Sequence, residues 1–400
     1  MKILQICHKV PYPPTDGGTI AMNNLTQGLL NSGHDVKVLA IETPKHPVTN
    51  DQLSSDYVQK VHFESVFIDT SLSLFSALKT VFSKQSYQVQ RFYSKELATR
   101  LTHILKQETY DVVQLESIYT TPYIPVIQKY SNAKIVLRTH NVEHFIWARI
   151  VKNEKNIFKK LILHYLTFQL KRYECSLSKK IDAFIAISHP DYLFFHQHYN
   201  HIPGMVIPFG VDVDAYENNE ENIPSPAPSL FYVGSMDWLP NIEGIHWFLE
   251  EVWDTILEKF PDVTFTIAGR KMPDEMFHSS FKNVVIVGEV PSAIDFIRSQ
   301  DIMIVPLLSG SGVRVKIIEG MALGKVVIAT SIAAEGLDVE DGKNILIANT
   351  PEQFVAAIEK CVKIPDVCTI IGENAQNFVA LYHNNEVIIK DLIKFYESIL

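Results

Sequence analysis

Short apolar runs alternate with longer segments of helical periodicity along the whole chain. Each run is rich in Val and Ile, is bounded by Gly, Pro, Asn or Asp, and is nearly continuous, which is typical of parallel strands buried on both faces of a sheet. We expect strands at residues 2–7, 35–41, 61–68, 111–115, 134–138 and 182–187 in the first half, and at 230–233, 264–268, 284–287, 302–305, 326–329 and 345–347 in the second.

About six strand–helix repeats in each half predict two doubly wound α/β domains. The length of 400 residues agrees, because single domains usually hold about 100–200 residues. Residues 217–229 are acidic and then Pro-rich, which is typical of a linker, although a hinge near Gly204 is an alternative. We therefore expect one domain at 1–204, a second at 205–382 and an amphipathic helix within 383–400.

Charge is divided unevenly between the halves of the chain. Residues 1–200 hold 23 Lys and Arg against 16 Asp and Glu, whereas residues 201–400 hold 13 against 29, so net charges of +7 and −16 make up the total of −9. This division argues against a general nucleic-acid-binding protein. No apolar run reaches the length of about 18 residues needed to span a membrane, and the N-terminus is typical of a strand rather than a secretion signal.

The four cysteines are far apart and form no CxxC pair: Cys7, Cys175, Cys361 and Cys368. Reduced thiols in a cytoplasmic protein are the simple interpretation. Association with the inner face of a membrane stays open, because residues 145–180 combine many lysines with apolar side chains and a basic amphipathic surface can bind anionic lipid. We favour the alternative that this helical segment packs by its apolar stripe.

Two groups of residues resemble metal sites but have simpler explanations. His189, His196, His198 and His201 lack a Cys or Glu at ligand spacing, so a surface helix and loop is the favoured interpretation. The segment 212–214 has the sequence Asp-Val-Asp, and we interpret it as a turn with Asp as a local cap. We therefore expect no metal and no cofactor.

The segment 306–325, PLLSGSGVRVKIIEGMALGK, is the strongest candidate for binding chemistry. A strand leads into a turn and a helix expected from about residue 313, with Ser309 and Ser311 as N-caps and glycines that allow a ligand to approach the backbone. The amides of the helix start, together with Arg314 and Lys316, predict an anion site suited to phosphate. Glu319 follows roughly 10 Å further along, where a carboxylate can accept from ribose hydroxyls.

The first half has two related features. Gly17 and Gly18 lie at a strand–helix turn and allow a phosphate or sugar to approach closely, but they form no GxGxxG, so a dehydrogenase loses support. His140 follows the strand at 134–138, at the carboxyl edge where open α/β sheets bind ligands. The alternative is a satisfied polar histidine with no role in chemistry.

These segments together resemble the family-4 retaining glycosyltransferases, and the similarity covers most of the chain. The matching segments are Gly17–Gly18, GHDV at 33–36, THN at 139–141, AIS at 186–188, VIPFGVD at 206–212, YVGS at 232–235, IAGR at 267–270 and the EGMALGKVVIAT that begins at Glu319. GSMDWLPNIEGIHWF at 234–248 with GSGVRVKIIE is similar to a bacterial cell-surface polysaccharide branch of that family.

The resemblance implies the GT-B fold, in which two Rossmann-like domains face each other and a C-terminal helix returns to the first. It implies transfer of a sugar, with retained configuration, from a nucleotide diphosphate to the hydroxyl of a sugar or lipid-linked acceptor, without a catalytic metal. Leaving diphosphate would then be stabilised by oriented amides and cations. A nucleotide-sugar epimerase or hydrolase on the same fold, and a non-catalytic nucleotide-sugar-binding protein, remain as alternatives.

The resemblance also assigns roles to residues. Glu319 corresponds to the second Glu of the family pair and would hold the donor ribose, whereas the first Glu is replaced by Ser311. The family's Arg and Lys would fall near Ser235 and Asn241, and we expect Arg314 and Lys316 to replace these cations at the diphosphate. The other residues expected at the donor are His140 beside the sugar, and Gly17, Gly18, Arg270, Ser311, Gly312 and Val313 at the diphosphate.

Overall fold

The computed structural model describes residues 1–14, 16–45, 47–48, 54–71, 86–216, 228–278, 280–310 and 312–400. Most of the predicted linker and Ser311 therefore lie outside the described residues. Two compact units are formed: Met1–Gly210 with Ile388–Leu400, and Val211–Val387. The boundary predicted after residue 204 differs from this division, because residues 204–206 form the last strand of the first sheet and the first unit continues to Gly210.

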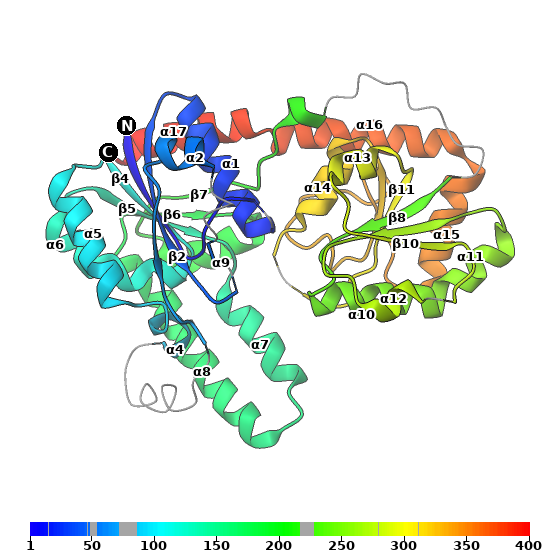
Figure 1. The fold of residues 1–400 in the computed structure, drawn as a ribbon, viewed down its shortest axis with the longest axis horizontal. Coiled ribbons are helices and arrows are strands. Elements are labelled where there is room, and N and C mark those ends of the chain that lie inside the picture. The colour runs from blue at the N-terminus through cyan, green and yellow to red at the C-terminus, as the bar shows by residue number, and fades with distance from the viewer. Residues whose placement is uncertain are drawn as a thin grey trace. The chain divides into compact units, whose positions relative to one another are not determined.

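The first unit is built on a parallel sheet in the order β3-β2-β1-β4-β5-β6-β7 (Figure 1). Its strands are β1 (Lys2–Cys7), β2 (Asp35–Glu42), β3 (Glu64–Phe67), β4 (Val112–Glu116), β5 (Lys134–Thr139), β6 (Ala183–Ala186) and β7 (Gly204–Val206). Its helices are α1 (Gly17–Asn31), α2 (Ser55–Lys60), α4 (Tyr87–Gln90), α5 (Lys95–Gln107), α6 (Ile124–Tyr130), α7 (Glu143–Asn153), α8 (Ile157–Ser176) and α9 (His189–Tyr199).

Helices cover both faces of this sheet because successive side chains of a strand point to opposite sides. On β1, Leu4 and Ile6 pack into a core with α5, α6 and α9, whereas Ile3 and Cys7 pack into a second core with α1. The last helix, α17 (Asn385–Ile399), joins this second core through buried residues such as Leu392.

The second unit is built on the parallel sheet β10-β9-β8-β11-β12-β13. Its strands are β8 (Leu230–Val233), β9 (Phe265–Ala268), β10 (Val284–Gly288), β11 (Ile302–Val305), β12 (Val326–Ala329) and β13 (Leu346–Ile347). Its helices are α10 (Leu239–Phe248), α11 (Asp254–Lys259), α12 (Asp274–Phe277), α13 (Ala293–Arg298), α14 (Val315–Ala322), α15 (Pro351–Lys363) and α16 (Pro365–Tyr382), with a π-helical turn at Leu249–Trp253. These two doubly wound α/β units agree with the fold class expected from the sequence.

Helices α7 and α8 form a hairpin that extends away from the sheet of the first unit (Figure 1). The C-terminal half of α8 packs on the core through Leu170 and Tyr173, and Leu166 packs separately with Tyr87. Its N-terminal half does not, because Phe158 is 76% exposed and Leu161 is 63% exposed. The expectation that this segment packs by its whole apolar stripe is therefore wrong for the first part of α8.

Among the described helices, none combines the length and the hydropathy that a membrane-spanning segment requires. All four cysteines carry free thiols, and two of them, Cys361 and Cys368, lie close enough for the Cys368 thiol to contact the carbonyl oxygen of Cys361 at 3.7 Å.

Candidate functional site

The topology of each sheet marks the place where a ligand is expected. In the first sheet β1 lies between β2 and β4, and in the second sheet β8 lies between β9 and β11. At each of these first strands the order of the sheet reverses direction. At such a switch point the loops at the carboxyl ends diverge and leave a crevice for ligands. The candidate residues of both units are found after these strand ends.

In the first unit, polar side chains replace apolar ones on the sheet face beneath α1 and α17. They come from alternate positions of three neighbouring strands, and all are almost fully buried: Gln5, Gln114, Glu116 and Arg138, followed by His140 at the end of β5. The Glu116 carboxylate is their centre. It accepts hydrogen bonds from Gln5 (2.8 Å), from Gln114 and from the Arg138 guanidinium (3.2 Å).

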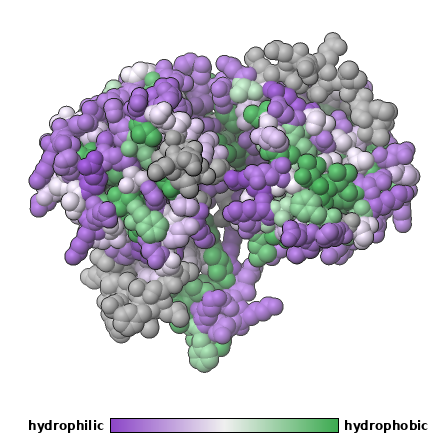
Figure 2. Space-filling view, viewed as in Figure 1, coloured by the Kyte–Doolittle hydropathy of each residue, from purple (hydrophilic) through white to green (hydrophobic). Residues whose placement is uncertain are grey.

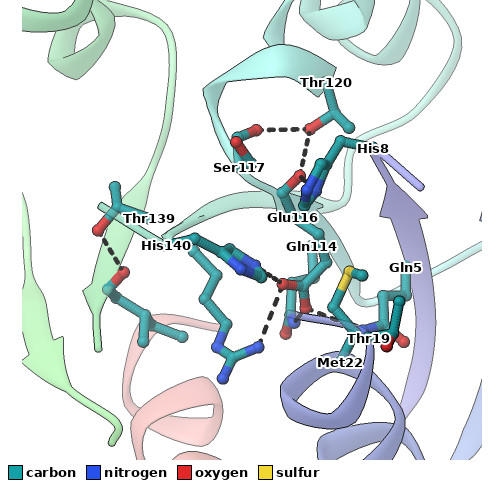
Figure 3. Close-up of polar contacts among 12 residues, drawn as sticks. Gln5, His8, Thr19, Met22, Gln114, Glu116, Ser117, Thr120, Thr139 and His140 are labelled. Carbon is teal, nitrogen blue, oxygen red and sulfur yellow. Dashed lines mark hydrogen bonds and ion pairs between the residues drawn. The ribbon is translucent and has the colours of Figure 1, made fainter. Parts of the chain in front are cut away.

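His140 is fixed by this carboxylate (Figure 3). Its Nε2 lies 2.6 Å from Glu116 Oε2, and an ionised carboxylate only accepts, so Nε2 carries the proton. Burial disfavours the charged form of the ring and lowers the pKa of His140, although Glu116 opposes this shift. His140 is therefore neutral near pH 7 with Nδ1 as an acceptor.

A second histidine, His8, lies against this one. Its Nδ1 donates to the carbonyl oxygen of Glu116 (3.1 Å), and its ring meets the His140 ring edge to face with centroids 5.2 Å apart. Burial, and then the neighbouring His140, hold the pKa of His8 well below its usual value. The two neutral rings thus present nitrogen atoms, not fixed charges, at the carboxyl edge of the sheet.

Gly17 and Gly18 lie in the first turn of α1, beside β1. The helix is capped by Asp16, whose carboxylate accepts from the Thr19 amide (2.9 Å) and also pairs with Lys9 (2.6 Å). A side chain at Gly18 would collide with the Lys9 ammonium, 2.8 Å from the added carbon. Any side chain at this position would require the Lys9 ammonium to move away from its place beside Asp16.

In the second unit, Lys316 reaches from α14 to the end of β8. Its ammonium donates to Tyr232 Oη (2.7 Å) and Asn241 Oδ1 (3.2 Å) and lies 4.2 Å from the centre of the Tyr232 ring. A side chain at Gly234 would collide with this ammonium. Lys316 therefore places its charge next to Ser235 and Asn241. These are the two positions at which the resemblance led us to expect an Arg and a Lys.

Arg314 adds a second cation to this edge. It is 93% buried, and its guanidinium lies 4.8 Å from the centre of the Trp238 ring, at the start of α10. The loss of water around Lys316, and then repulsion by Arg314, lower the pKa of Lys316 to about 7. An anion bound here would restore the charge of the lysine.

Glu319 lies one turn beyond Lys316 on α14. Tyr216 donates to its carboxylate at 3.4 Å, and burial raises the pKa of Glu319 above its usual value. Tyr216 belongs to the short helix Val213–Tyr216 that contains most of the Asp-Val-Asp segment, so this segment forms a turn beside Glu319.

The loop before α14 differs in detail from the expectation. α14 begins at Val315, its N-cap is Arg314, and no side chain caps it; Ser309 bonds Glu243 instead (3.3 Å). Gly310 and Gly312 have φ values of +122° and +85°, which only glycine adopts readily. Val313 follows Gly312 in the same loop.

Arg270 lies in a different loop, after β9. Its carbonyl oxygen accepts a hydrogen bond from the Met236 amide (2.9 Å).

The histidines of α9 form no metal cluster in the described residues. His189 and His196 flank Tyr192, whereas His198 Nδ1 donates to the Phe194 carbonyl oxygen (2.9 Å). More generally, the parts of the chain that the structure describes contain no group of three or more His, Cys, Asp or Glu placed to hold a metal ion.

Sequence reasoning missed Glu116, Arg138 and His8 in the first unit, and Tyr216, Tyr232 and Trp238 in the second. The first group has a signal in the sequence, because polar residues at 114 and 116 and at 138 and 140 interrupt two apolar strands at a spacing of two. The second group has none, since aromatic residues are ordinary components of a core.

Comparison with known proteins finds two matching family models, one in each half of the chain. The profile of the family described as Glycosyltransferase Family 4 matches residues 15–215, and the profile described as Glycosyl transferases group 1 matches residues 227–363. An uncharacterized 44.6 kDa protein in the cps region of Klebsiella pneumoniae is 25% identical over 98% of this chain and 99% of its own length. The phosphatidyl-myo-inositol mannosyltransferase of Mycobacterium tuberculosis is 23% identical over 48% of this chain and 53% of its own.

Solved structures share the fold over the whole chain. Sucrose-phosphate synthase from Thermosynechococcus elongatus superposes with a TM-score of 0.70 at 15% identity, covering 100% of this chain and 99% of its own. HepE from Anabaena, solved in complex with UDP, superposes with a TM-score of 0.66 at 14% identity, covering 100% of both chains.

Proposed function

Because the chain belongs to glycosyltransferase family 4 and is a glycosyltransferase of the GT-B class, we propose that it moves a sugar from a nucleotide diphosphate to an acceptor hydroxyl with retained configuration. The bond between the anomeric carbon and the diphosphate oxygen breaks, and the acceptor oxygen forms a new bond on the same face. The acceptor proton passes to the leaving diphosphate. This balance needs no other reactant.

The observation that carries the proposal is the pair of cations at the carboxyl edge of the second sheet. Arg314 lies beside Gly310 and Trp238, and Lys316 occupies the space next to Gly234. A leaving diphosphate develops negative charge, so cations held in place before the reaction lower its barrier without rearrangement. Glu319 on the same helix accepts from the donor ribose hydroxyls in this arrangement.

His140 is assigned to the donor sugar. A neutral imidazole with Nε2 fixed on Glu116 offers Nδ1 as an acceptor for a sugar hydroxyl, and its orientation is set before the substrate arrives. Gly17 and Gly18, at the start of α1, are assigned to the diphosphate, as are Arg270, Ser311, Gly312 and Val313 in the second unit. Catalysis requires no metal or cofactor in this proposal.

The acceptor is proposed to be a sugar or lipid-linked glycan in the synthesis of a bacterial cell-surface polysaccharide. The relative in the cps region of Klebsiella pneumoniae and the mycobacterial phosphatidyl-myo-inositol mannosyltransferase support this class. The place of action is proposed to be the cytoplasm, at the inner face of the cell membrane.

The test begins with donor binding. UDP is the first probe because the HepE structure contains it, and GDP and the two nucleoside monophosphates complete the titration series. We expect calorimetry to show tighter binding of a diphosphate than of its monophosphate. Arg314→Ala and Lys316→Met should each weaken the diphosphate by about 10- to 100-fold, the cost of a charged hydrogen bond. Lys343→Met, at an exposed cation of the same unit, is the matched control.

Turnover is then measured with UDP- and GDP-sugars in the presence and absence of bacterial lipid extract. We expect transfer of the sugar to the lipid. NMR of the product should show the same anomeric configuration as in the donor. Release of free sugar at the same rate without acceptor would indicate a hydrolase, and equal affinity of Arg314→Ala for the diphosphate would remove the assigned cation site.

A further inference from the structure

One face of α8 carries large apolar side chains into solvent. Phe158 is 76%, Leu161 63% and Ile157 61% exposed, and three further residues of this helix are at least 40% exposed. We call the whole set the α8 stripe: Ile157, Phe158, Leu161, Ile162, Tyr165 and Phe168. Single exposed apolar residues are ordinary, but a contiguous group of six on one helix marks an interaction surface.

The stripe is a true helical face. At 100° per residue its six members fall within an arc of about 140°, and they extend over about 16 Å of helix. Of the residues that α8 buries, Leu166, Leu170 and Glu174 lie on a different face, whereas Gln169 falls near the Ile162 edge of the arc. Packing on the first unit therefore holds the helix in place and leaves the stripe pointing outward.

The charged residues around the stripe are predominantly basic. From Phe145 to Arg172 the sequence holds seven Lys and Arg against one acidic residue, Glu154, in a chain whose net charge is −9. Glu154 is paired with Lys159 at 2.7 Å. On the helix, Lys159 lies on one border of the apolar arc and Lys171 on the other. Long basic side chains at the borders of an apolar face can extend toward lipid headgroups while the face enters the bilayer.

Figure 2 shows the hairpin end as a hydrophobic strip with hydrophilic surface beside it. Its place in the fold suits contact with a planar surface, since α7 and α8 extend beyond the sheet that they pack on (Figure 1). Apolar burial and the attraction of lysines to anionic headgroups then act on the same helix face.

We propose that the α8 stripe docks the enzyme on an anionic lipid bilayer, with α8 lying in the plane of the interface. This rests on different residues from the proposed sugar transfer, so either proposal can fail alone. Docking would place a transferase of lipid-linked acceptors at the surface that holds them.

The test is sedimentation with vesicles of phosphatidylcholine alone and of phosphatidylcholine with 30 mol% phosphatidylglycerol. We expect the full-length enzyme to bind the anionic vesicles at least tenfold more tightly than the neutral ones, and less tightly in 0.5 M than in 0.1 M KCl. Phe158→Ser combined with Leu161→Ser should weaken binding to anionic vesicles at least tenfold. Leu381→Ser with Tyr382→Ser, at positions 67% and 60% exposed on α16, is the matched control and should bind as the wild type does.

Circular dichroism melting and the affinity for UDP separate docking from folding and from donor binding. Both should be unchanged in the stripe variant, because its residues are exposed. Equal binding to neutral and anionic vesicles, or wild-type binding by the stripe variant, would overturn the proposal. A third outcome would also overturn it: light scattering shows a dimer of the wild type, the stripe variant is a monomer, and neither binds vesicles. The stripe would then be an interface between two copies of this chain.

Discussion

The buried carboxylate of Glu116 is the centre of a hydrogen-bond network in the first unit. Glu116 is fully buried, and its four hydrogen-bond partners come from β1, β4 and β5 and the residue after β5. Desolvation alone would raise its pKa, but the Arg138 guanidinium and His140 hold it well below the usual range. Removing one member of such a pair leaves the other charge buried without compensation, which costs more than the pair contributes.

Glu116→Gln tests this dependence. We expect the variant to lower the free energy of unfolding of the first unit by about 3 kcal/mol at pH 7. The folded pKa of Glu116 lies below its unfolded value of about 4.3, so this stabilisation is present above about pH 5 and decreases as the pH falls. This free energy of unfolding is measured by urea unfolding, with pulsed hydrogen exchange of the β1, β4 and β5 peptides as the probe.

The matched control for this carboxylate is Glu108→Gln, since Glu108 is an exposed carboxylate of the same unit. It should change the unfolding free energy by less than about 0.5 kcal/mol. A difference between Glu116→Gln and the wild type that stays constant from pH 7 to pH 3 would contradict the assigned charge state.

The pKa of Lys316 is lowered to about 7, so the binding of a diphosphate should depend on pH. A bound diphosphate favours the protonated lysine and raises that pKa, so binding above pH 7 takes up a proton. The affinity for a nucleoside diphosphate should thus fall by up to about tenfold per pH unit above pH 7. Calorimetry in buffers of different ionisation enthalpy counts the proton.

In Lys316→Met this fall of affinity between pH 7 and pH 9 should be absent, while the weaker binding itself remains measurable. A wild-type affinity that stays constant from pH 7 to pH 9 would show that the lysine is already charged before the ligand binds, and would refute the lowered pKa.

At the scale of elements, the apolar runs predicted most strands because parallel strands buried on both faces leave a nearly continuous signal. The strands at 2–7, 230–233, 302–305 and 326–329 coincide with β1, β8, β11 and β12. β7 (Gly204–Val206) was missed because three residues that include a glycine carry no periodicity. It is defined only by pairing with β6.

Helix contacts were harder to predict than helix positions. The basic segment was correctly expected to be helical, but its sequence has apolar residues on two faces, and only the fold decides that Leu166 and Leu170 are buried while Phe158 and Leu161 are exposed. The start of α14 was likewise placed two residues early, since serines near a glycine turn favour capping and the structure uses Arg314 as N-cap instead.

The candidate site shows the same limit at the level of side chains. Lys316 and Glu319 could be selected because a strand, a glycine turn and a helix with cations form a local pattern. Their partners Tyr232 and Tyr216 are 84 and 103 residues away in the chain. Such contacts depend on the order of strands in the sheet, which local periodicity does not contain.

At the scale of the whole molecule, the two units have separate hydrophobic cores, and the uneven charge follows the division between them. The acidic second half binds the anionic donor in the proposed function, so its net charge of −16 opposes the ligand outside the immediate site. Lys316 and Arg314 are local exceptions that place positive charge at the proposed diphosphate site. Net charge therefore describes the surface of each half and not its binding site.

Separate cores also predict where a nucleotide stabilises the protein. A ligand at 100 times its Kd adds about 2.7 kcal/mol to the stability of the state that binds it. With UDP or GDP, whichever binds more tightly, amides of β8, β11 and β12 that exchange by unfolding of the second unit should slow by up to about 100-fold, as followed by hydrogen-exchange mass spectrometry. Lys316→Met at the same ligand concentration should lose most of this protection. Protection confined to β1, β4 and β5 would instead assign the diphosphate to the first unit, at Gly17 and Gly18.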